Sequence, residues 1–398
     1  MSSLLFKPLT IRGFTARNRV MVSPMQQYAS TRGDGMANDH HLVHLGRFAM
    51  GGAGMVIAEA TAISPEGRMA HADLGLWNDA QIEPLARIAR FIEDQNSVPG
   101  LQLVHAGRKG AIQAPWDGAG PLTEADTARG EPPWPLIGPT ALAAGAGWQT
   151  PIEMSQAEIN RTIADWASAA RRAAEAGFRI IDLHGAHGYL LHAFISPLSN
   201  TRTDDYGGSR ENRMRYPFEV IEEIRRAIPE TVALFYRLSI LDGLEGGWTV
   251  EDSAVFCQGL IDRGVDVIDC SSGGAIADRS GDSRVRRGYA FHAPYSRAMK
   301  QVLTGGHVAT VGLIVDALQA EAILQAGDAD IVAIGRELLI DPNWTYRARE
   351  AVEGLSFDCW PRESGWWLDK RLQVLRRLSE AGETPMTRYT AKAHDIGR

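Results

Sequence analysis

Residues 155–184, SQAEINRTIADWASAARRAAEAGFRIIDLH, contain one complete helix–strand unit of this chain. Ser155 and Glu158 form an S-x-x-E capping box, in which each side chain can bind the other residue's backbone N–H. Apolar and alanine residues then recur at helical spacing as far as Ala176. The next apolar run, Ile180–His184, has the length and composition of a strand that is buried on both faces.

Similar apolar runs recur along the chain and alternate with helical patterns. The predicted strands are Arg19–Pro24, Gly54–Ala60, Leu101–His105, Ile180–His184, Ala233–Leu238, Val267–Cys270, Val308–Val311 and Ile331–Ile334. One helix is expected to open at Thr249 and Asp252 and to run to about Asp262, and another is expected over Ala317–Ala326. Alternating units of this kind predict the α/β class and a single (β/α)8 TIM barrel. No G-x-G-x-x-G follows the first strand, which disfavours a Rossmann domain.

The barrel is expected to span residues 1–345, with a long loop at residues 111–151 after the third strand. This loop is rich in proline, glycine and alanine, and such loops commonly act as lids, subunit contacts or mobile segments. Residues 346–398 are expected to form a C-terminal helical extension that could contact a partner subunit.

The composition excludes several classes of protein. Lys and Arg number 41 and Asp and Glu 48, so the formal charge of −7 argues against nucleic-acid binding and an electrostatic membrane anchor. The three cysteines form no C-x-x-C pair, which disfavours a disulfide scaffold, a zinc ribbon and an iron–sulfur cluster. The first ten residues lack a signal-peptide pattern, and no apolar run approaches about 18 residues. A cytoplasmic protein is therefore expected.

The carboxyl ends of the predicted strands carry distinctive residues, and this is where TIM-barrel active sites lie. The residues at these ends are Ser23, Pro24, Met25, Gln102, His105, His184, His187, Tyr189, Arg237, Ser271, Ser272, Gly273, Gly274, Gly312, Gly335 and Arg336. Glycines after the last two strands, together with Arg336, suggest a phosphate site or simple chain turns. Burying Arg237 requires an anionic partner, which could be an acidic side chain or a cofactor atom.

His184, His187 and Tyr189 lie within six residues of sequence. Two histidines could chelate a metal, but no third ligand is evident nearby, and no metal is predicted. Alternatively, two imidazoles can donate hydrogen bonds to one carbonyl oxygen while a phenol supplies a proton. We favour this second interpretation.

The stretch His184-Gly-Ala-His187-Gly-Tyr189, followed by SPLSNTRTDDYGGSRENR at residues 196–213, resembles the old yellow enzyme family of FMN-dependent ene-reductases. Asn18-Arg19, Ser23-Pro24-Met25, residues 102–107 and residues 311–314 resemble it as well. The resemblance extends from Leu5 to about Trp344. Tyr28 and the chain length resemble the thermophilic-like, xenobiotic-reductase-like branch most.

The resemblance implies a tightly bound, non-covalent FMN that is reduced by NADPH or NADH. Its implied contacts are Pro24, Met25, Gln26 and Ala60 along the isoalloxazine, Gln102 at the pyrimidine edge, Arg237 at N1 and O2, and Gly312, Gly335 and Arg336 at the phosphate. Tyr28, His184 and His187 would contact the substrate, an α,β-unsaturated carbonyl compound. Tyr189 would protonate it after hydride transfer from N5. A homodimer or homotetramer is implied.

Two features depart from the family pattern. Gln26 replaces the cysteine that is usual in the branch and, with residues 39–45, also resembles reductases of aryl-CoA compounds. An alternative function therefore stays open: a flavin reductase that acts on an aryl- or enoyl-CoA thioester or on a degradative metabolite. A CoA group would need a local cationic patch, for which Arg108, Lys109 or Arg129 are candidates. A non-catalytic ligand-binding barrel is the least favoured alternative.

The second departure is at the C-terminus. In the branch, a partner's C-terminal segment reaches the active site. The candidates for that role here are Trp360, Arg362, Trp366 and Trp367, although ordinary packing would account for them equally well.

Overall fold

The computed structural model describes residues 3–277, 285 and 287–384. The chain divides into two compact units, Met1–Glu353 and Gly354–Arg398, each described by itself. The last 14 residues of the predicted C-terminal extension, 385–398, lie outside the described part.

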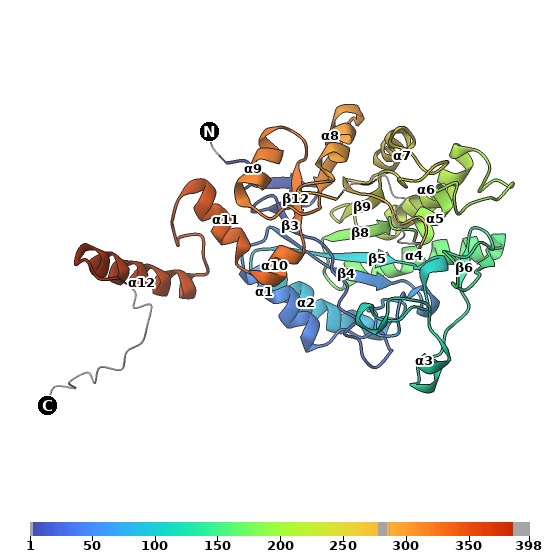
Figure 1. Ribbon diagram of the computed structural model, residues 1–398, viewed down its shortest axis with the longest axis horizontal. Helices are drawn as coiled ribbons and strands as arrows, with labels where there is room; N and C mark the ends of the chain where they lie inside the picture. The colour runs from blue at the N-terminus through green and yellow to red at the C-terminus, as the bar shows by residue number, and fades with distance from the viewer. Residues whose placement is uncertain (1–2, 278–284, 286, 385–398) are drawn as a thin grey trace. The chain divides into compact units, whose positions relative to one another are not determined.

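The first unit is built on a closed barrel of eight parallel strands (Figure 1). In barrel order the strands are β3 (Val20–Val22), β4 (Met55–Ala62), β5 (Val98–Val104), β8 (Ile180–Gly185), β9 (Ala233–Ser239), β10 (Val267–Ser271), β11 (His307–Thr310) and β12 (Ile331–Ile334). All eight predicted strands are therefore confirmed. Almost every residue in them is buried, as the continuous apolar runs predict.

Helices surround this barrel, with α1 and α2 on one side of the strands in Figure 1 and α7 and α8 on the other. Their bounds are α1 (Asp39–Met50), α2 (Ile82–Asp94), α4 (Gln156–Glu175), α5 (Leu190–Ile195), α6 (Arg210–Ala227), α7 (Val250–Asp262), α8 (Ala293–Val302), α9 (Ala317–Gln325), α10 (Arg336–Ile340) and α11 (Trp344–Glu353). The predicted capping box of α4 is present, since Ser155 N donates to Glu158 Oε2 at 2.8 Å and Ser155 Oγ accepts from Glu158 N at 3.3 Å.

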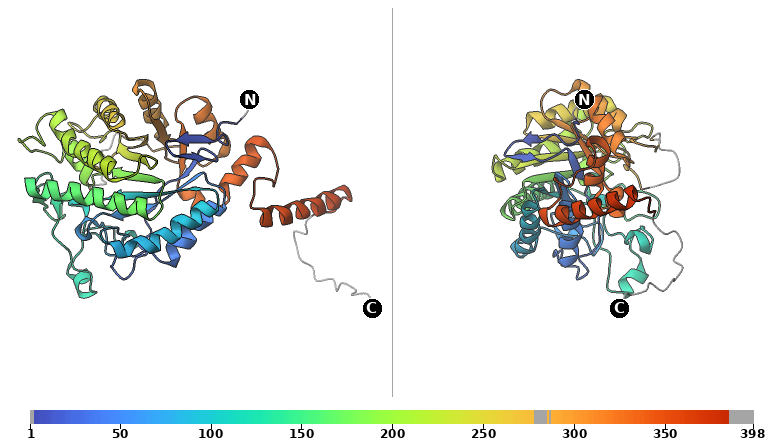
Figure 2. Two further views of the ribbon diagram at one scale, coloured as in Figure 1. Left: turned by 180° about the vertical axis from the view of Figure 1, so that it is seen from behind. Right: turned by 90° about the vertical axis from the view of Figure 1, so that its left-hand side faces the viewer.

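A hairpin that the sequence did not predict, β1 (Leu9–Ile11) and β2 (Phe14–Ala16), closes the amino-terminal end of the barrel. Leu9, Ile11 and Ala16 pack with the inward residues at the starts of the strands, such as Met55 and Phe235. Figure 2 shows the two short strands lying together in dark blue. The hairpin therefore covers this end of the barrel with apolar side chains.

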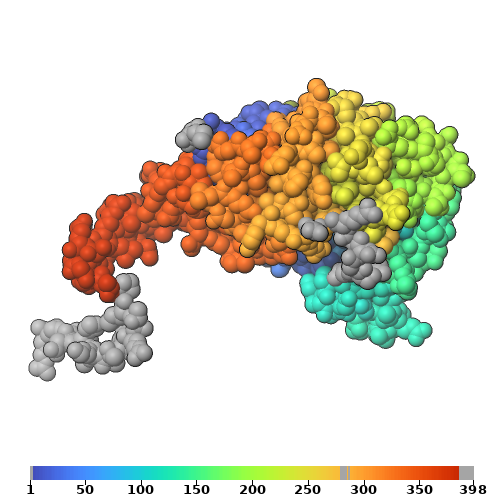
Figure 3. Space-filling view, turned by 45° about the horizontal axis from the view of Figure 1, so that its top comes forward, coloured from blue at the N-terminus to red at the C-terminus, as the bar shows by residue number. Residues whose placement is uncertain are grey.

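The predicted loop at residues 111–151 is more structured than expected. It contains α3 (Glu124–Ala128), and β6 (Ile137–Gly138) pairs with β7 (Ile152–Glu153). Figure 3 shows it in teal as a projection from the surface of the first unit. The guanidinium of Arg108 holds the later part of this loop, because the guanidinium donates to the carbonyl oxygens of Leu142 and Ala143 at 3.3 and 3.2 Å.

The second unit contains one long helix, α12 (Arg362–Glu380). Several of its large apolar side chains are exposed, namely Trp366, Trp367, Val374, Leu375 and Leu378. None of the helices among the described residues is both long enough and apolar enough to cross a membrane.

Candidate functional site

A cavity of about 1190 Å³ opens at the carboxyl ends of the barrel strands. Eight of the residues that the resemblance implies as cofactor, substrate or catalytic contacts line it: Met25, Tyr28, His187, Tyr189, Arg237, Gly312, Gly335 and Arg336. They come from parts of the chain that are far apart in the sequence: the loops after β3, β8, β11 and β12, and β9 itself, which contains Arg237. Their meeting in one place follows from the barrel, in which all the strand ends point the same way.

The other predicted site residues lie beside the cavity and not on its lining. Gln102 and His184 are buried on β5 and β8, and Ala60 is buried on β4. Ala60 belongs to a small apolar cluster against which Tyr189 packs. Pro24 and Gln26 are half-buried in the segment after β3.

The two histidines and the tyrosine of the β8 turn form one cluster. His184 Nε2 lies 3.4 Å from His187 Nδ1, and the ring of Tyr189 stands edge-on to His184 with centroids 4.7 Å apart. His184 Nδ1 accepts from the backbone N–H of Ala186 at 3.3 Å, which leaves the His184 proton on Nε2. His187 Nε2 lies 2.7 Å from Ser271 Oγ. When Ser271 donates this bond, both facing nitrogens are N–H donors, and an acceptor oxygen between them would satisfy both.

Burial sets the protonation of these groups. It lowers the pKa of both histidines well below the ordinary value, assisted by the charge of Arg237 at His184 and by His184 at His187. Burial also raises the pKa of Tyr189 above its ordinary value, with smaller contributions from Tyr28 and Asp73. At neutral pH the imidazoles are therefore neutral hydrogen-bond donors, and the phenol keeps its proton.

Arg237 brings a largely buried cation to the cavity. Its Nη1 donates to Ser23 Oγ at 2.9 Å and lies 3.5 Å from Asp269 Oδ2, while its Nε has no hydrogen-bond partner among the described residues. Burial raises the pKa of the neighbouring Asp182 to about 8, assisted by the charge of Asp269. Asp182 is thus mainly neutral at pH 7, and the guanidinium is incompletely satisfied by protein groups. An anionic ligand atom would complete its bonding.

The ends of β11 and β12 form the other side of the cavity. Gly312 has φ +114°, and a Cβ at this position would lie only 2.8 Å from the ring of Phe291. A side chain there is therefore excluded, and the backbone stays open to the cavity. Gly335 precedes α10, whose first residue is the exposed Arg336. Open backbone N–H groups beside a cation fit a phosphate.

Two buried carboxyl groups support the cavity wall formed by Met25–Tyr28. Glu59 Oε2 accepts from the backbone N–H of Gln27 at 2.7 Å, and Asp73 Oδ1 accepts from Gln26 Nε2 at 2.8 Å. Burial raises the pKa of Glu59 to about 8 and that of Asp73 to about 7. The amide of Gln26 is thereby tied to Asp73, and its Oε1 is buried without a hydrogen-bond partner among the described residues.

Sequence reasoning missed Asp242 and His292, which line this cavity. The strand-end residue Ser271 lines it as well, and Lys109 Nζ donates to the carbonyl oxygen of His187 at 2.8 Å. Adjacent strands contribute these residues, so only the closed barrel reveals them.

The cations expected near a CoA ligand are largely engaged by the protein. Arg108 is buried and bound to carbonyl oxygens, and Arg129 forms an ion pair with Asp126. Lys109 lines the cavity, but its Nζ is hydrogen-bonded to backbone carbonyl oxygens. In the described part of the chain, no three His, Cys, Asp or Glu side chains are grouped as a metal site.

The residues of the cavity fit the flavin that the sequence resemblance implies. A largely buried, partly unsatisfied guanidinium, a glycine whose Cβ would collide with Phe291, and a cation at the strand ends together suit an anionic ligand with a phosphate. The interior volume also suits a ligand larger than a simple metabolite.

Comparison with known proteins supports this interpretation. The model of the NADH:flavin oxidoreductase / NADH oxidase family matches residues 4–354. An NADPH dehydrogenase of Bacillus subtilis (strain 168) is 39% identical over 357 residues, which cover 89% of this chain and 96% of that protein.

Solved structures share the fold. Morphinone reductase in complex with tetrahydroNAD has a TM-score of 0.68 at 27% identity, covering 88% of this chain and 92% of that one. A 2-naphthoyl-CoA reductase has a TM-score of 0.77 at 23% identity and covers 90% of this chain and 53% of that one. At that identity the second likeness concerns the fold alone.

Proposed function

The chain belongs to the NADH:flavin oxidoreductase / NADH oxidase family, which is the old yellow enzyme family, and is an FMN-dependent NAD(P)H oxidoreductase. From this premise we propose that it is an ene-reductase. Its substrates would be small α,β-unsaturated carbonyl compounds, whose activated C=C bond is reduced. The chain is an enzyme, and the alternative of a non-catalytic barrel no longer applies.

The observation that carries this proposal is the pair of imidazole nitrogens, His184 Nε2 and His187 Nδ1, 3.4 Å apart. Two N–H donors that converge in this way match one carbonyl oxygen, on which negative charge develops as the alkene accepts hydride. Tyr189 stands beside them with its proton retained. These are the donors that reduction of an activated alkene requires.

The remaining residues would hold the cofactor. Arg237 would meet the pyrimidine edge of FMN together with Gln102, and Gly312, Gly335 and Arg336 would bind its phosphate. Met25, Gln26 and Ala60 would border its ring. Bound there, FMN supplies hydride accepted from NADPH or NADH. The protein's part is to orient the substrate carbonyl with His184 and His187 and to deliver the proton of Tyr189 to the substrate α-carbon.

The test is a comparison of the two half-reactions under anaerobic conditions. NADPH should bleach the yellow enzyme, and 2-cyclohexen-1-one should restore its colour and yield cyclohexanone. Molecular oxygen serves as the control oxidant. If oxygen restores the colour but a series of simple enones and enals does not, the ene-reductase proposal is wrong.

An aryl- or enoyl-CoA reductase is the second candidate. It is favoured by the large cavity and by Arg287, a further cation on its lining. Steady-state kcat/KM for crotonyl-CoA and 2-naphthoyl-CoA against cyclohexenone would distinguish the two. A preference for a thioester of about 100-fold or more would replace the first proposal.

A further inference from the structure

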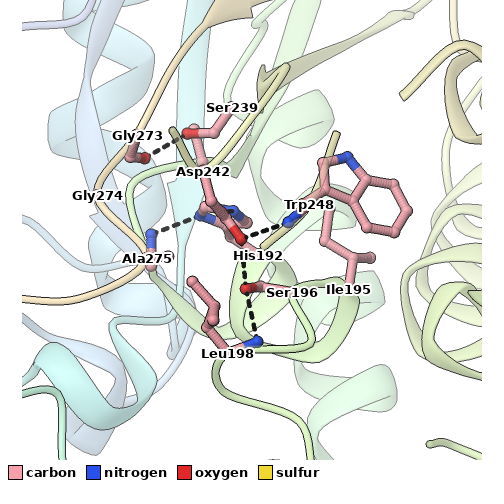
Figure 4. A network of polar contacts seen from close by, with 12 residues as sticks. His192, Ile195, Ser196, Leu198, Ser239, Asp242, Trp248, Gly273, Gly274 and Ala275 are labelled. Carbon is pink, nitrogen blue, oxygen red and sulfur yellow. Dashed lines mark hydrogen bonds and ion pairs between the residues drawn. The ribbon is translucent and has the colours of Figure 1, made fainter. Parts of the chain in front are cut away.

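A buried polar network contacts the turn that carries His187 and Tyr189, through the backbone N–H of Gly188. Figure 4 shows its centre, where His192 of α5 points toward Asp242 in the segment after β9. His192 Nε2 lies 2.8 Å from Asp242 Oδ1, and the other carboxylate oxygen accepts from Ser196 Oγ and Trp248 N, both at 2.7 Å. The side chains of His192 and Asp242 are completely buried.

The hydrogen bonds determine the tautomer of His192. Its Nδ1 accepts from the backbone N–H of Gly188 at 2.8 Å, so this nitrogen carries no proton. The proton is on Nε2 and is donated to Asp242. Burial alone would raise the pKa of Asp242, but its hydrogen bonds from His192, Trp248 and Ser196 outweigh burial and hold that pKa below its ordinary value.

The turn that receives this support is strained. His187 has φ +60°, a left-handed backbone conformation that residues other than glycine rarely adopt. Its N–H donates to Ser239 Oγ at 3.1 Å, and its carbonyl oxygen accepts from Lys109 Nζ at 2.8 Å. The next N–H, that of Gly188, is the one bound by His192. Side chains thus hold the polar backbone groups on both sides of His187, as strained residues at functional sites require.

The composition of the network, Ser196, His192 and Asp242, could suggest a nucleophilic triad, but its geometry contradicts this. Ser196 Oγ donates to Asp242 Oδ2 and not to the imidazole. Both ring nitrogens of His192 are engaged by Gly188 and Asp242, so no base faces the hydroxyl. The network is therefore supporting and not reactive.

We propose that Asp242 and His192 are positioning residues for the catalytic turn. Asp242 fixes the tautomer of His192, and His192 Nδ1 holds the Gly188 N–H, which keeps His187 and Tyr189 in their reactive arrangement. The catalytic consequence rests on the proposed function, whereas the support of the turn does not depend on it.

Asp242→Asn tests this proposal because it removes charge at nearly constant shape. The NH2 group of the new amide would face either the Nε2–H of His192 or the backbone N–H of Trp248. In either orientation two N–H donors would point at each other with no acceptor between them. If His192 changes tautomer to relieve this conflict, its Nδ1–H opposes the Gly188 N–H. We expect kcat/KM for cyclohexenone to fall about 10–100-fold while FMN content stays unchanged.

Asp266→Asn is the matched control. Asp266 is also a largely buried carboxylate that accepts a backbone N–H, from Leu234 at 2.8 Å, but it precedes β10 at the opposite end of the barrel. A similar loss of kcat/KM in this variant would show that any buried charge change has the effect, and would overturn the proposal.

Amide hydrogen exchange of the FMN-loaded enzyme provides a readout independent of activity. The proposal requires faster exchange in residues 185–190 of Asp242→Asn, with β3, β4 and β12 unchanged. Unchanged exchange in 185–190, or an increase spread over the whole barrel, would contradict it. If the wild type reduces no enone but this exchange pattern appears, only the proposed function fails.

Two substitutions at His192 keep the test decisive if Asp242→Asn does not fold. In His192→Asn the amide oxygen can still accept from Gly188 N–H, whereas His192→Phe preserves the ring shape without any acceptor. The Asn variant should retain at least about tenfold more kcat/KM than the Phe variant. Equal activities would rule out the bond to Gly188 as the means of positioning.

Discussion

Tyr189 is the residue at which the proposed chemistry is most directly tested. Its phenol is protonated and stands beside His184, so it can supply a proton to the substrate without affecting hydride arrival at the flavin. Tyr189→Phe should therefore slow enone-dependent reoxidation about 10²–10⁴-fold and leave reduction by NADPH within about threefold of the wild type. Stopped-flow absorbance resolves the two steps. Equal losses in both half-reactions would remove Tyr189 from the proton-donor role.

Arg237 should control cofactor retention. Replacing it by methionine removes a buried cation and leaves Asp269, whose pKa burial raises, without its charged neighbour. We expect FMN affinity to fall at least about tenfold, measured by recovery of flavin fluorescence on dilution, with partial recovery in Arg237→Lys. Arg161→Met, which breaks an exposed ion pair with Asp165, is the control. Unchanged FMN affinity in Arg237→Met would place the cofactor elsewhere in the cavity.

Glu59 should make stability depend on pH. Burial raises its pKa to about 8, whereas in the unfolded chain it titrates near its ordinary value of 4.5. Between these two pKa values the folded state binds one proton more than the unfolded state. The contribution of Glu59 to the free energy of unfolding is therefore fully present below about pH 4.5 and is lost as the pH rises toward 8. Glu59→Gln keeps an acceptor for Gln27 N–H and should reduce that loss by about 1–3 kcal/mol.

Urea unfolding at pH 5.5 and pH 8 measures the effect of Glu59→Gln. Asp73, with a pKa of about 7, contributes equally to the pH dependence of unfolding in the wild type and in Glu59→Gln. Glu83→Gln, at an exposed position of α2, should leave the pH dependence as it is in the wild type. A pH dependence that does not change in Glu59→Gln would show that this carboxyl is already ionised in the folded protein.

The sequence revealed those site residues that stand at strand ends or within a distinctive motif, such as Arg237 and His187. It did not reveal Asp242, because a single Asp carries no pattern of its own, and it placed Ser271 at a strand end without indicating its partner. Their importance comes from contacts across the barrel, as between His187 and Ser271, 84 residues apart in sequence. Such pairs become visible only once the strands are in register.

At the scale of elements, two loops meet where glycine is required. Gly274 has φ +86°, and a Cβ there would lie 2.6 Å from the Cα of His187. Gly274→Ala should displace the β8 turn and lower kcat/KM for cyclohexenone about 10–100-fold. Gly246→Ala, with φ +69° but nothing within 4 Å of its Cβ, introduces a similar backbone strain without a contact. Similar losses in both variants would attribute the effect to strain alone.

The same scale shows which parts of the fold a sequence can predict. Strands such as β8 and β12 are buried on both faces, so they appear as continuous apolar runs, and the box at Ser155 and Glu158 marks the start of α4. The three-residue strands β1 and β2 are too short to show periodicity. They exist because Leu9 and Ile11 seal the barrel, which is a tertiary cause.

At the scale of the whole molecule, the second unit raises the question of assembly. Helix α12 exposes Trp367, Val374 and Leu378 at intervals of seven and four residues, which places them on one face. An exposed apolar face on a helix usually marks an interface. A homodimer or homotetramer, as the sequence resemblance implies, would bury it against the same face of another copy, since the apolar side chains of the two helices can pack together.

We therefore expect the combined variant Trp367→Glu and Val374→Glu to be smaller in solution than the wild type, because carboxylates on this face of each helix oppose their pairing. Light scattering after size exclusion gives the mass, and the visible spectrum verifies that FMN stays bound in the first unit. Asp369→Lys with Arg376→Glu changes charges elsewhere on α12 and should leave the mass unaltered. If the wild type is itself a monomer, or if the apolar-face variant keeps its full mass, α12 does not join the copies, and its tryptophans serve another contact.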